Sequence, residues 1–379
     1  MFLLKFIRII RKKSFLHDIL YIFLATRIAI FFLALFFIGF SNVDRNITLY
    51  DAFSQWDGQW YLKVATEGYH WNGPYTQANV AFFPLYPLTA KILSLATHNL
   101  ELSFLIVSNV SYFIFLIFLY KITNFFYDRE TSIRTVWYLS IFPLSFIFSI
   151  FYNESLFLMM VAGAIYFAYK KRWSVAVLFA ILGALARGAG LVLLPTLLFY
   201  YFKSSKKYKF SELIQILMIP VGIMLFSIYL WFKVGDFLAY IHILKAWKIL
   251  YQNPLITIAS TFELIKILPK YNYFTALSIF DLIILVFLFI LLILSYKRLP
   301  KELFLFSILI FIFYISKSWD PTFFYPMGST NRYLFEAFPL FLTLAKLGKN
   351  KFIDVSYVAF SLIFLGILSL SFFSGKWVF

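Results

Sequence analysis

The chain has 379 residues, of which 62% are hydrophobic and only 13% charged, with a net charge of +17 and no cysteine. A soluble protein of this size could not bury so much apolar surface, and without cysteine there are no disulfides or thiolate metal sites. The positive charge does not indicate nucleic acid, because the lysines and arginines stand in short clusters between apolar segments, as in cytosolic loops of membrane proteins.

Repeated apolar runs of about 20 residues predict an all-α polytopic membrane protein with about 11 transmembrane helices. Residues 19–40 form the first span, which is too long for the apolar part of a signal peptide. Basic residues precede it and place the N-terminus in the cytosol. Arg27 lies inside this span, and its side chain is expected either to snorkel to the cytosolic face or to point inward.

Residues 41–101 form a large first outer loop, in which acidic residues outnumber basic ones. Within it, residues 82–97 are apolar but contain two prolines and are short for a span. This segment is predicted to be an interfacial helix that lies along the outer leaflet.

The rest of the chain alternates between apolar segments and basic clusters. Residues 173–203 carry Arg187 between glycines and have basic clusters at both ends, which predicts two short helices that meet near Arg187. Residues 233–273 form a second large outer loop. We see no repeat or soluble domain, so residues 1–379 are one membrane domain. The other predicted spans are residues 102–123, 133–151, 155–169, 211–232, 274–296, 303–316, 332–346 and 352–373.

Asp57 is the first candidate for chemistry, because it lies in a polar, aromatic loop of an otherwise apolar chain. A carboxylate at the membrane interface suits a general base for a substrate hydroxyl. The alternative is that Asp57 caps a helix over residues 58–66, since aspartate is favoured at that position. Asp51, six residues earlier, could cap another turn. The residue pattern leaves both readings of Asp57 open.

Arg187 is expected where two half-helices meet, and broken helices at membrane depth are tolerated where they line a cavity. Its guanidinium could hold two phosphate oxygens. Arg332 begins a predicted helix, where a cation opposes the macrodipole, so it should bind an anion or pair with Glu336 one turn later. Asn153 and Glu154 lie at the outer end of a span, in a substrate-lining site or an ordinary turn.

His242 and Lys245 share one face of a predicted amphipathic helix in the second outer loop, and Trp247 lies on another face. Interfacial packing with Trp247 as a membrane anchor is the plain interpretation. A role in substrate binding is the alternative.

Several segments together resemble bacterial and archaeal relatives of the GPI mannosyltransferase II (PIG-V) family of GT-C glycosyltransferases. They occur in the family's order, and the first loop, with Trp-Asp followed by Phe-Pro-Leu-Tyr-Pro, is the most specific. The matching segments are QWDGQWYLKVATEGY at 55–69, AFFPLYPL at 81–88, FPLSFIFSIFYNESLFL at 142–158, ALARGAGLVLLP at 184–195, GDFLAYIHILKAW at 235–247 and NRYLFEAFPLFL at 331–342.

The resemblance implies a GT-C-like bundle whose active site lies on the non-cytosolic face. It implies transfer of a hexose, in the first place mannose, from a polyprenyl-phosphate sugar to an acceptor hydroxyl with inversion. Asp57 matches the catalytic aspartate of the family's first loop. Glu154 and Arg187 fall in family motifs that line the substrate. The residues we expect to bind substrate are Gln55, Trp56, Tyr86, Asn153, Glu154, Arg187, His242, Lys245 and Arg332.

We expect no cofactor and no metal ion, since a phosphodiester leaving group gains little charge. The expected partners are the bilayer, the lipid-linked sugar and an acceptor glycan, glycolipid or protein. The membrane would be a plasma membrane with the site outside, or an endoplasmic reticulum membrane with a luminal site. Two other classes fit the apolar composition: a flippase or transporter of lipid-linked sugars, and a non-catalytic subunit of a glycan-assembly complex. A transporter would favour inverted repeats, and none is visible.

Overall fold

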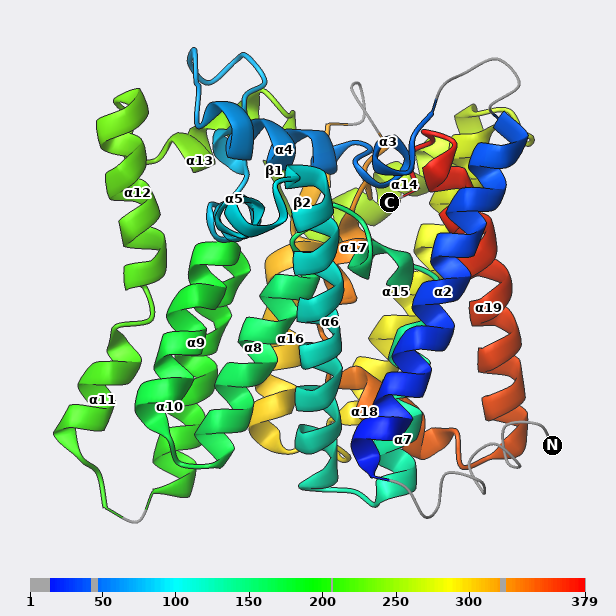
Figure 1. Cartoon of the computed structure of the whole chain (residues 1–379). Helices are drawn as coiled ribbons and strands as arrows, with labels where there is room; N and C mark the ends of the chain where they lie inside the picture. The colour runs from blue at the N-terminus through cyan, green and yellow to red at the C-terminus, as the bar shows by residue number, and fades with distance from the viewer. Residues whose placement is uncertain (1–13, 42–46, 206, 321–324, 379) are drawn as a thin grey trace.

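The computed structural model describes residues 14–41, 47–205, 207–320 and 325–378, and these form an almost entirely α-helical bundle (Figure 1). Four helices are long and apolar enough to cross a bilayer, and the consecutive helices α11 and α12, bent by 41°, form a fifth candidate span. The chain is therefore an integral multi-pass membrane protein. The long helices are α2 (Phe15–Ser41), α6 (Leu100–Asn124), α15 (Tyr273–Ser295) and α19 (Lys351–Phe373), and the bent pair is α11 (Phe210–Leu217) and α12 (Val221–Val234).

Shorter helices complete the bundle, and several predicted spans are broken in the structure. Three prolines explain the breaks at residues 143, 220 and 339, because proline removes a helical hydrogen bond and constrains the preceding residue. The predicted spans 133–151, 211–232 and 332–346 are thus not continuous helices, and the count of eleven is not confirmed. The shorter helices are α7 (Arg129–Ile141), η2 (Ser145–Phe148), α8 (Glu154–Tyr169), α9 (Trp173–Ala186), η3 (Gly188–Val192), α10 (Leu193–Ser204), α16 (Lys301–Ile315), α17 (Thr330–Leu334) and α18 (Leu340–Leu347).

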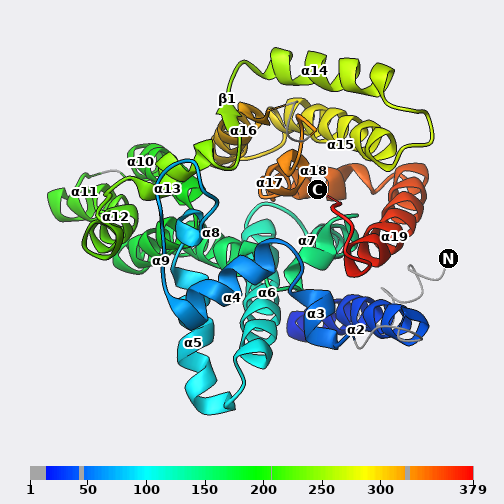
Figure 2. The same cartoon turned by 90° about the horizontal axis from the view of Figure 1, so that it is seen from above.

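The two predicted outer loops gather at one end of the bundle (Figure 1). In the first, whose residues 42–46 lie outside the described residues, α4 and α5 lie across the ends of the long helices (Figures 1 and 2). The helix predicted at 82–97 is therefore present as α5, and its place along the outer leaflet stays a prediction. The loops hold α3 (Leu49–Phe53), α4 (Asp57–Glu67), η1 (Asn79–Ala81) and α5 (Leu85–Thr97), then α13 (Ala239–His242), η4 (Ile243–Lys245), β1 (Ile249–Tyr251) and α14 (Pro254–Ile267).

Two short strands tie the second outer loop to the segment after α16. Strand β1 pairs antiparallel with β2 (Lys317–Trp319), with Tyr251 opposite Lys317 and Ile249 opposite Trp319. Because side chains alternate along a strand, Lys317 and Trp319 share one face. The ladder lies at the end of the bundle where α4 lies (Figure 1), and Lys317 and Trp319 line the same cavity as residues of α4.

Arg27 does not snorkel but is buried inside the bundle. Its Nη1 donates to the carbonyl oxygen of Ser145 at 2.9 Å and to Ser149 Oγ at 3.2 Å. Its Nη2 reaches the carbonyl oxygen of Ser140 at 3.4 Å, in the last turn of α7, where helix carbonyls have no helical partner and must be satisfied internally within a membrane. Arg27 therefore stabilises a broken span.

The predicted meeting of two half-helices near Arg187 is confirmed, since α9 ends at Ala186 and η3 begins at Gly188. Gly190 makes this turn possible, because a Cβ there would lie 2.5 Å from the backbone nitrogen of Ala184. A Cβ at Gly183 would make only ordinary contacts, the nearest at 3.6 Å.

Replacing Gly190 by alanine is therefore expected to lower the free energy of unfolding by about 1–3 kcal/mol, because the added methyl overpacks the turn against α9. The thermal midpoint of the purified protein measures this. Gly183→Ala is the matched control and should not lower the midpoint, since alanine also favours the helix. Equal midpoints for the two variants would contradict the close approach at Gly190.

Candidate active site

The Trp-Asp-Gly motif adopts an unusual local conformation at the start of α4. Trp56 has φ 56° and ψ −114°, a combination that costs energy for any residue except glycine. Gly58 allows α4 to approach the main bundle, because a Cβ there would lie 3.1 Å from Phe151 Cβ. The motif therefore presses the first turn of α4 against the end of the bundle and leaves Asp57 at the interface.

Asp57 is not a helix cap. It is the first residue of α4, and the helix has no side-chain cap. Its Oδ2 accepts instead from Arg332 Nη2 at 2.7 Å, across the molecule. Thr48 is the N-cap residue of α3, and Asp51, the third residue of that helix, completes a reciprocal capping box with it. The capping alternative is thus wrong for Asp57, whereas Asp51 takes part in the cap of α3 without being the N-cap residue.

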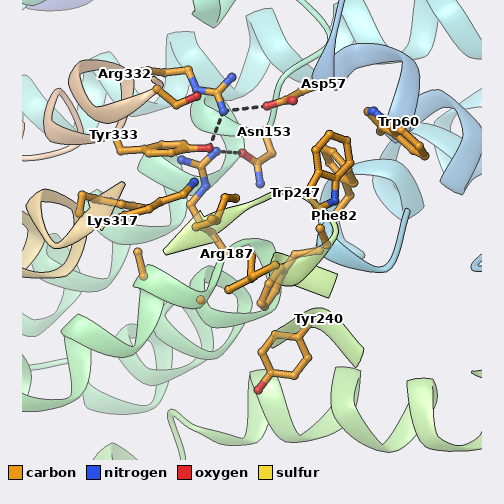
Figure 3. Close-up of a pocket in the computed structure, with 18 of the residues that line it drawn as sticks. Asp57, Trp60, Phe82, Asn153, Arg187, Tyr240, Trp247, Lys317, Arg332 and Tyr333 are labelled. Carbon is orange, nitrogen blue, oxygen red and sulfur yellow. Dashed lines mark hydrogen bonds and ion pairs between the residues drawn. The ribbon is translucent and has the colours of Figure 1, made fainter. Parts of the chain in front are cut away.

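A buried network of charges continues from Asp57 into the bundle (Figure 3). Arg332 Nε lies 3.3 Å from Glu154 Oε1, and Arg187 Nη2 donates to the same oxygen at 2.9 Å. Arg187 also bonds Glu336 through Nη1. The side chains of Glu154 and Glu336 are each 1% exposed, so both carboxylates depend on these arginines for compensation.

The network corrects one expected pair. Glu336 was the predicted partner of Arg332, but the structure pairs Glu336 with Arg187 and pairs Arg332 with Asp57 and Glu154. The short helix α17 ends at Leu334, so these two residues do not lie on one helical face. Arg332 thus links the outer loop to the bundle rather than stabilising its own segment.

A cavity of about 780 Å³ lies under α4 and beside this network. One end of its wall is charged, with Asp57, Arg187, Lys317 and Arg332. Tyr61 contributes a hydroxyl, and burial raises the pKa of its phenol well above the ordinary value, so it remains protonated. The aromatic and apolar remainder includes Trp56, Trp60, Phe82, Phe83, Leu191, Ile223, Tyr240, Ile241, Leu244, Trp247, Tyr251, Phe313, Trp319 and Trp377.

The predicted site residues divide into three groups in the structure. Trp56, Asp57, Asn153, Arg187 and Arg332 line the cavity. Glu154 lies behind its wall, where it binds both arginines. The roles of these residues in substrate binding remain predictions.

The other four predicted residues do not line the cavity. Gln55 donates to the backbone oxygen of Asp51, and Tyr86 is buried with its hydroxyl 2.6 Å from Ser108 Oγ. His242 Nδ1 lies 2.6 Å from Asp236 Oδ2, and Lys245 is exposed. The His242 side chain thus has a local partner, and the neighbouring loop residue Trp247 reaches the cavity instead.

Sequence reasoning missed two polar residues of the cavity, Lys317 and Tyr333. The Tyr333 hydroxyl accepts from Arg332 Nη2 at 2.7 Å, and Lys317 Nζ lies 4.4 Å from the centre of the Tyr333 ring. Lys317 follows an apolar helix, and in the sequence it cannot be distinguished from an ordinary lysine in a loop. Tyr333 is one of 26 tyrosines and carries no distinguishing pattern.

Asp281 is a further buried carboxyl, in span α15, that positions the site through its neighbour. Asn331 Nδ2 donates to the backbone oxygen of Asp281 at 2.9 Å and to its Oδ1 at 2.8 Å. Asn331 directly precedes Arg332 on α17, so this pair holds the helix that carries the arginine.

Replacing Asp281 by leucine is expected to leave a buried amide of Asn331 short of an acceptor, at a cost of about 1–3 kcal/mol. Asp281→Asn keeps an acceptor oxygen at the same position and should rescue much of the loss. The thermal midpoint reports the cost. A leucine variant as stable as the wild type would contradict this role.

Metal binding is not suggested by the geometry. Within the described ranges, no three His, Asp or Glu side chains come close enough together to hold an ion. The expectation that the reaction needs no metal remains a prediction.

Comparisons with known proteins support the fold. No protein-family model matches this chain, and neither does any curated protein sequence. Among solved structures, it is similar to ArnT from Cupriavidus metallidurans bound to undecaprenyl phosphate, with a TM-score of 0.50 and 11% identity over 83% of this chain and 69% of ArnT. It also aligns with the oligosaccharyltransferase of Archaeoglobus fulgidus in its apo form, with a TM-score of 0.44, 12% identity and 94% of this chain covered.

This chain spans 56% of the length of the archaeal oligosaccharyltransferase, and that alignment is too loose to carry an argument. The ArnT match shows a GT-C-like fold, as predicted. The narrower resemblance to the PIG-V family has no matching family model behind it and stays a prediction.

Proposed function

We propose that this protein is a membrane glycosyltransferase that transfers a hexose, specifically mannose, from a polyprenyl-phosphate carrier to an acceptor hydroxyl. One observation carries the proposal. The Asp57 carboxylate, a set of cations and a long aromatic and apolar wall share a single cavity at the end of a membrane-spanning bundle. That combination fits a substrate in which an anionic phosphate joins a sugar to a hydrocarbon chain. The undecaprenyl phosphate bound to ArnT, a protein of similar fold, supports this class of donor.

The chemistry follows from the position of Asp57. Its carboxylate accepts the proton of the acceptor hydroxyl, and the acceptor oxygen bonds to the anomeric carbon on the face opposite the phosphate. The bond between that carbon and the phosphate oxygen breaks, its electron pair stays with the oxygen, and polyprenyl phosphate leaves. The anomeric centre is inverted. Cations that are already fixed around the leaving phosphate stabilise this step without reorganisation.

Arg332 positions the base in this scheme. Its Nη2 holds Asp57 Oδ2 at 2.7 Å, while the Asp57 side chain is 23% exposed and can reach a substrate in the cavity. Aromatic residues around the cavity, with Trp60 and Trp247 packed edge to face, surround the space where the sugar and its acceptor would lie. The resemblance to the PIG-V family is the support for mannose.

We place the reaction on the non-cytosolic side of a plasma membrane, or in the lumen of the endoplasmic reticulum. The support is the distribution of lysine and arginine along the sequence, which puts the 41–101 and 233–273 loops outside the cytosol. The acceptor belongs to the glycans, glycolipids or proteins that are present there. A protease-accessibility experiment on intact cells or spheroplasts, with tags inserted in the two loops, tests the side directly.

A donor-consumption assay tests the function. Purified protein in nanodiscs is incubated with polyprenyl-phosphate-mannose and, in parallel, with the glucose analogue, and free polyprenyl phosphate is measured. Release of polyprenyl phosphate from the mannose donor that depends on Asp57 supports the proposal. Faster release from the glucose donor would contradict mannose as the transferred sugar. A flippase would carry intact donor across a liposome without consuming it, and a non-catalytic subunit would do neither.

A further inference from the structure

Of the cations that line the cavity, Arg187 and Arg332 are already bound to carboxylates. Arg187 contacts Glu154 and Glu336, and Arg332 contacts Asp57 and Glu154. Moving Arg187 to a substrate would leave the buried Glu336 uncompensated, which is expensive in a medium of low polarity, and moving Arg332 would release Asp57, the proposed base. These arginines therefore serve first to hold the site together.

Lys317 is the exception among these cations. Its Nζ lies 4.4 Å from the centre of the Tyr333 ring, and no described carboxylate lies within ion-pair distance. Arg332 and Arg187 lie beside the same ring, with their guanidinium carbons 4.7 and 5.1 Å from its centre. In Figure 3, Lys317 and Arg332 lie on opposite sides of Tyr333. This leaves one positive charge at the cavity without a negative partner.

The β1–β2 ladder fixes Lys317 in place. Lys317 pairs with Tyr251 across the strands, and the buried Ser318 Oγ donates to the carbonyl oxygen of Pro326 at 3.2 Å. Trp319, which shares the face of Lys317, donates its Nε1 hydrogen to the carbonyl oxygen of Gly328 at 2.9 Å. The lysine thus extends from an anchored strand rather than from a free loop.

Charged and apolar residues both line the cavity together with Lys317. The guanidinium groups of Arg187 and Arg332 lie beside the same Tyr333 ring as the lysine. Apolar lining residues come from α16, η3, α12 and η4, among them Phe313, Leu191, Ile223 and Leu244. A cation in a cavity with both kinds of lining suits the anionic link between a polar head and a hydrocarbon chain.

On the basis of the proposed function, we propose that Lys317 binds the phosphate of the donor and selects a monophosphate-linked carrier over a diphosphate-linked one. One unpaired cation matches the single negative charge of a phosphodiester. A diphosphate linkage carries more negative charge, and the part left without a counter-ion would be buried at a cost.

A binding experiment tests this assignment without depending on turnover. Affinity for the methyl phosphodiester of a short-chain polyprenol, which carries the single charge of the donor link, is measured by quenching of tryptophan fluorescence in the full chain, with polyprenyl alcohol and polyprenyl methyl diphosphate in parallel. Lys317→Gln is expected to weaken phosphate binding by about tenfold or more, since a hydrogen bond to a charged group is lost. Lys317→Arg should retain binding. Lys91→Gln, at an exposed lysine of α5 that does not line the cavity, is the matched control.

The results separate failure of this assignment from failure of the proposed function. If the wild type binds the polyprenyl phosphodiester and Lys317→Gln binds it equally well, Lys317 is not the phosphate ligand, although the donor class stands. Diphosphate binding as tight as monophosphate binding would overturn the selectivity. If the wild type binds the phosphate no better than the alcohol, the proposed donor class itself is wrong. Competition by millimolar inorganic phosphate would identify a free-anion site and contradict a lipid-linked ligand.

Discussion

Asp57→Asn is expected to lower sugar transfer by about 10²–10⁴-fold, which is the usual range for loss of a positioned general base. Asparagine keeps an oxygen that can accept from Arg332, so the contact between α4 and the bundle should persist. Membrane insertion and the thermal midpoint should therefore change little. The measurement is single-turnover consumption of polyprenyl-phosphate-mannose by the purified variant.

Asp51→Asn supplies the control for this experiment. Asp51 lies in the same loop, is exposed, and completes the capping box of α3 rather than lining the cavity. Asparagine keeps a side-chain oxygen that can accept from the backbone nitrogen of Thr48, so transfer should stay within about twofold of the wild type. If Asp57→Asn turns over at a near-normal rate, or Asp51→Asn loses as much activity, Asp57 is not the base.

The second large effect is expected on stability. Arg187→Gln should lower the free energy of unfolding by about 3–5 kcal/mol, because it leaves two buried carboxylates, Glu154 and Glu336, without their shared cation. The yield of folded protein and the thermal midpoint should both fall. Lys266→Gln breaks an exposed pair with Glu263 and should leave the midpoint unchanged.

A double variant distinguishes loss of charge balance from a simple loss of packing. Arg187→Gln combined with Glu336→Gln removes one cation and one anion, so it should be more stable than Arg187→Gln alone. A coupling energy of about 0.5–3 kcal/mol between the two sites is expected. Strict additivity would indicate that the two side chains do not interact, and would contradict the buried network.

Some of the fold could be read from the sequence because transfer of an apolar segment into a bilayer depends mainly on that segment itself. The spans at α2, α6, α15 and α19 were all predicted, and so was the turn at Arg187, where glycines interrupt an apolar run. The prolines at 143, 220 and 339 were visible too, but apolar residues continue past each of them. Hydropathy alone therefore predicted one continuous span at places where the backbone forms two separate helices.

Arg27 shows the limit of reasoning from one segment. An arginine nine residues into a span can snorkel or turn inward, and the choice depends on what the neighbouring helix offers. Here the break after α7 provides carbonyl acceptors, among them that of Ser145 at 2.9 Å from Nη1. Residues far apart in the sequence decide the orientation.

By itself the sequence determined a multi-pass helical membrane protein, an acid in the first outer loop and arginines at interrupted helices. Only the tertiary structure decided how these charges pair. Arg332 and Asp57 are 275 positions apart and yet share a hydrogen bond of 2.7 Å, while Glu336, four positions from Arg332, turns to Arg187. Hydropathy acts segment by segment along the chain, whereas charge pairing depends on distances in three dimensions, and those distances exist only once the helices have packed.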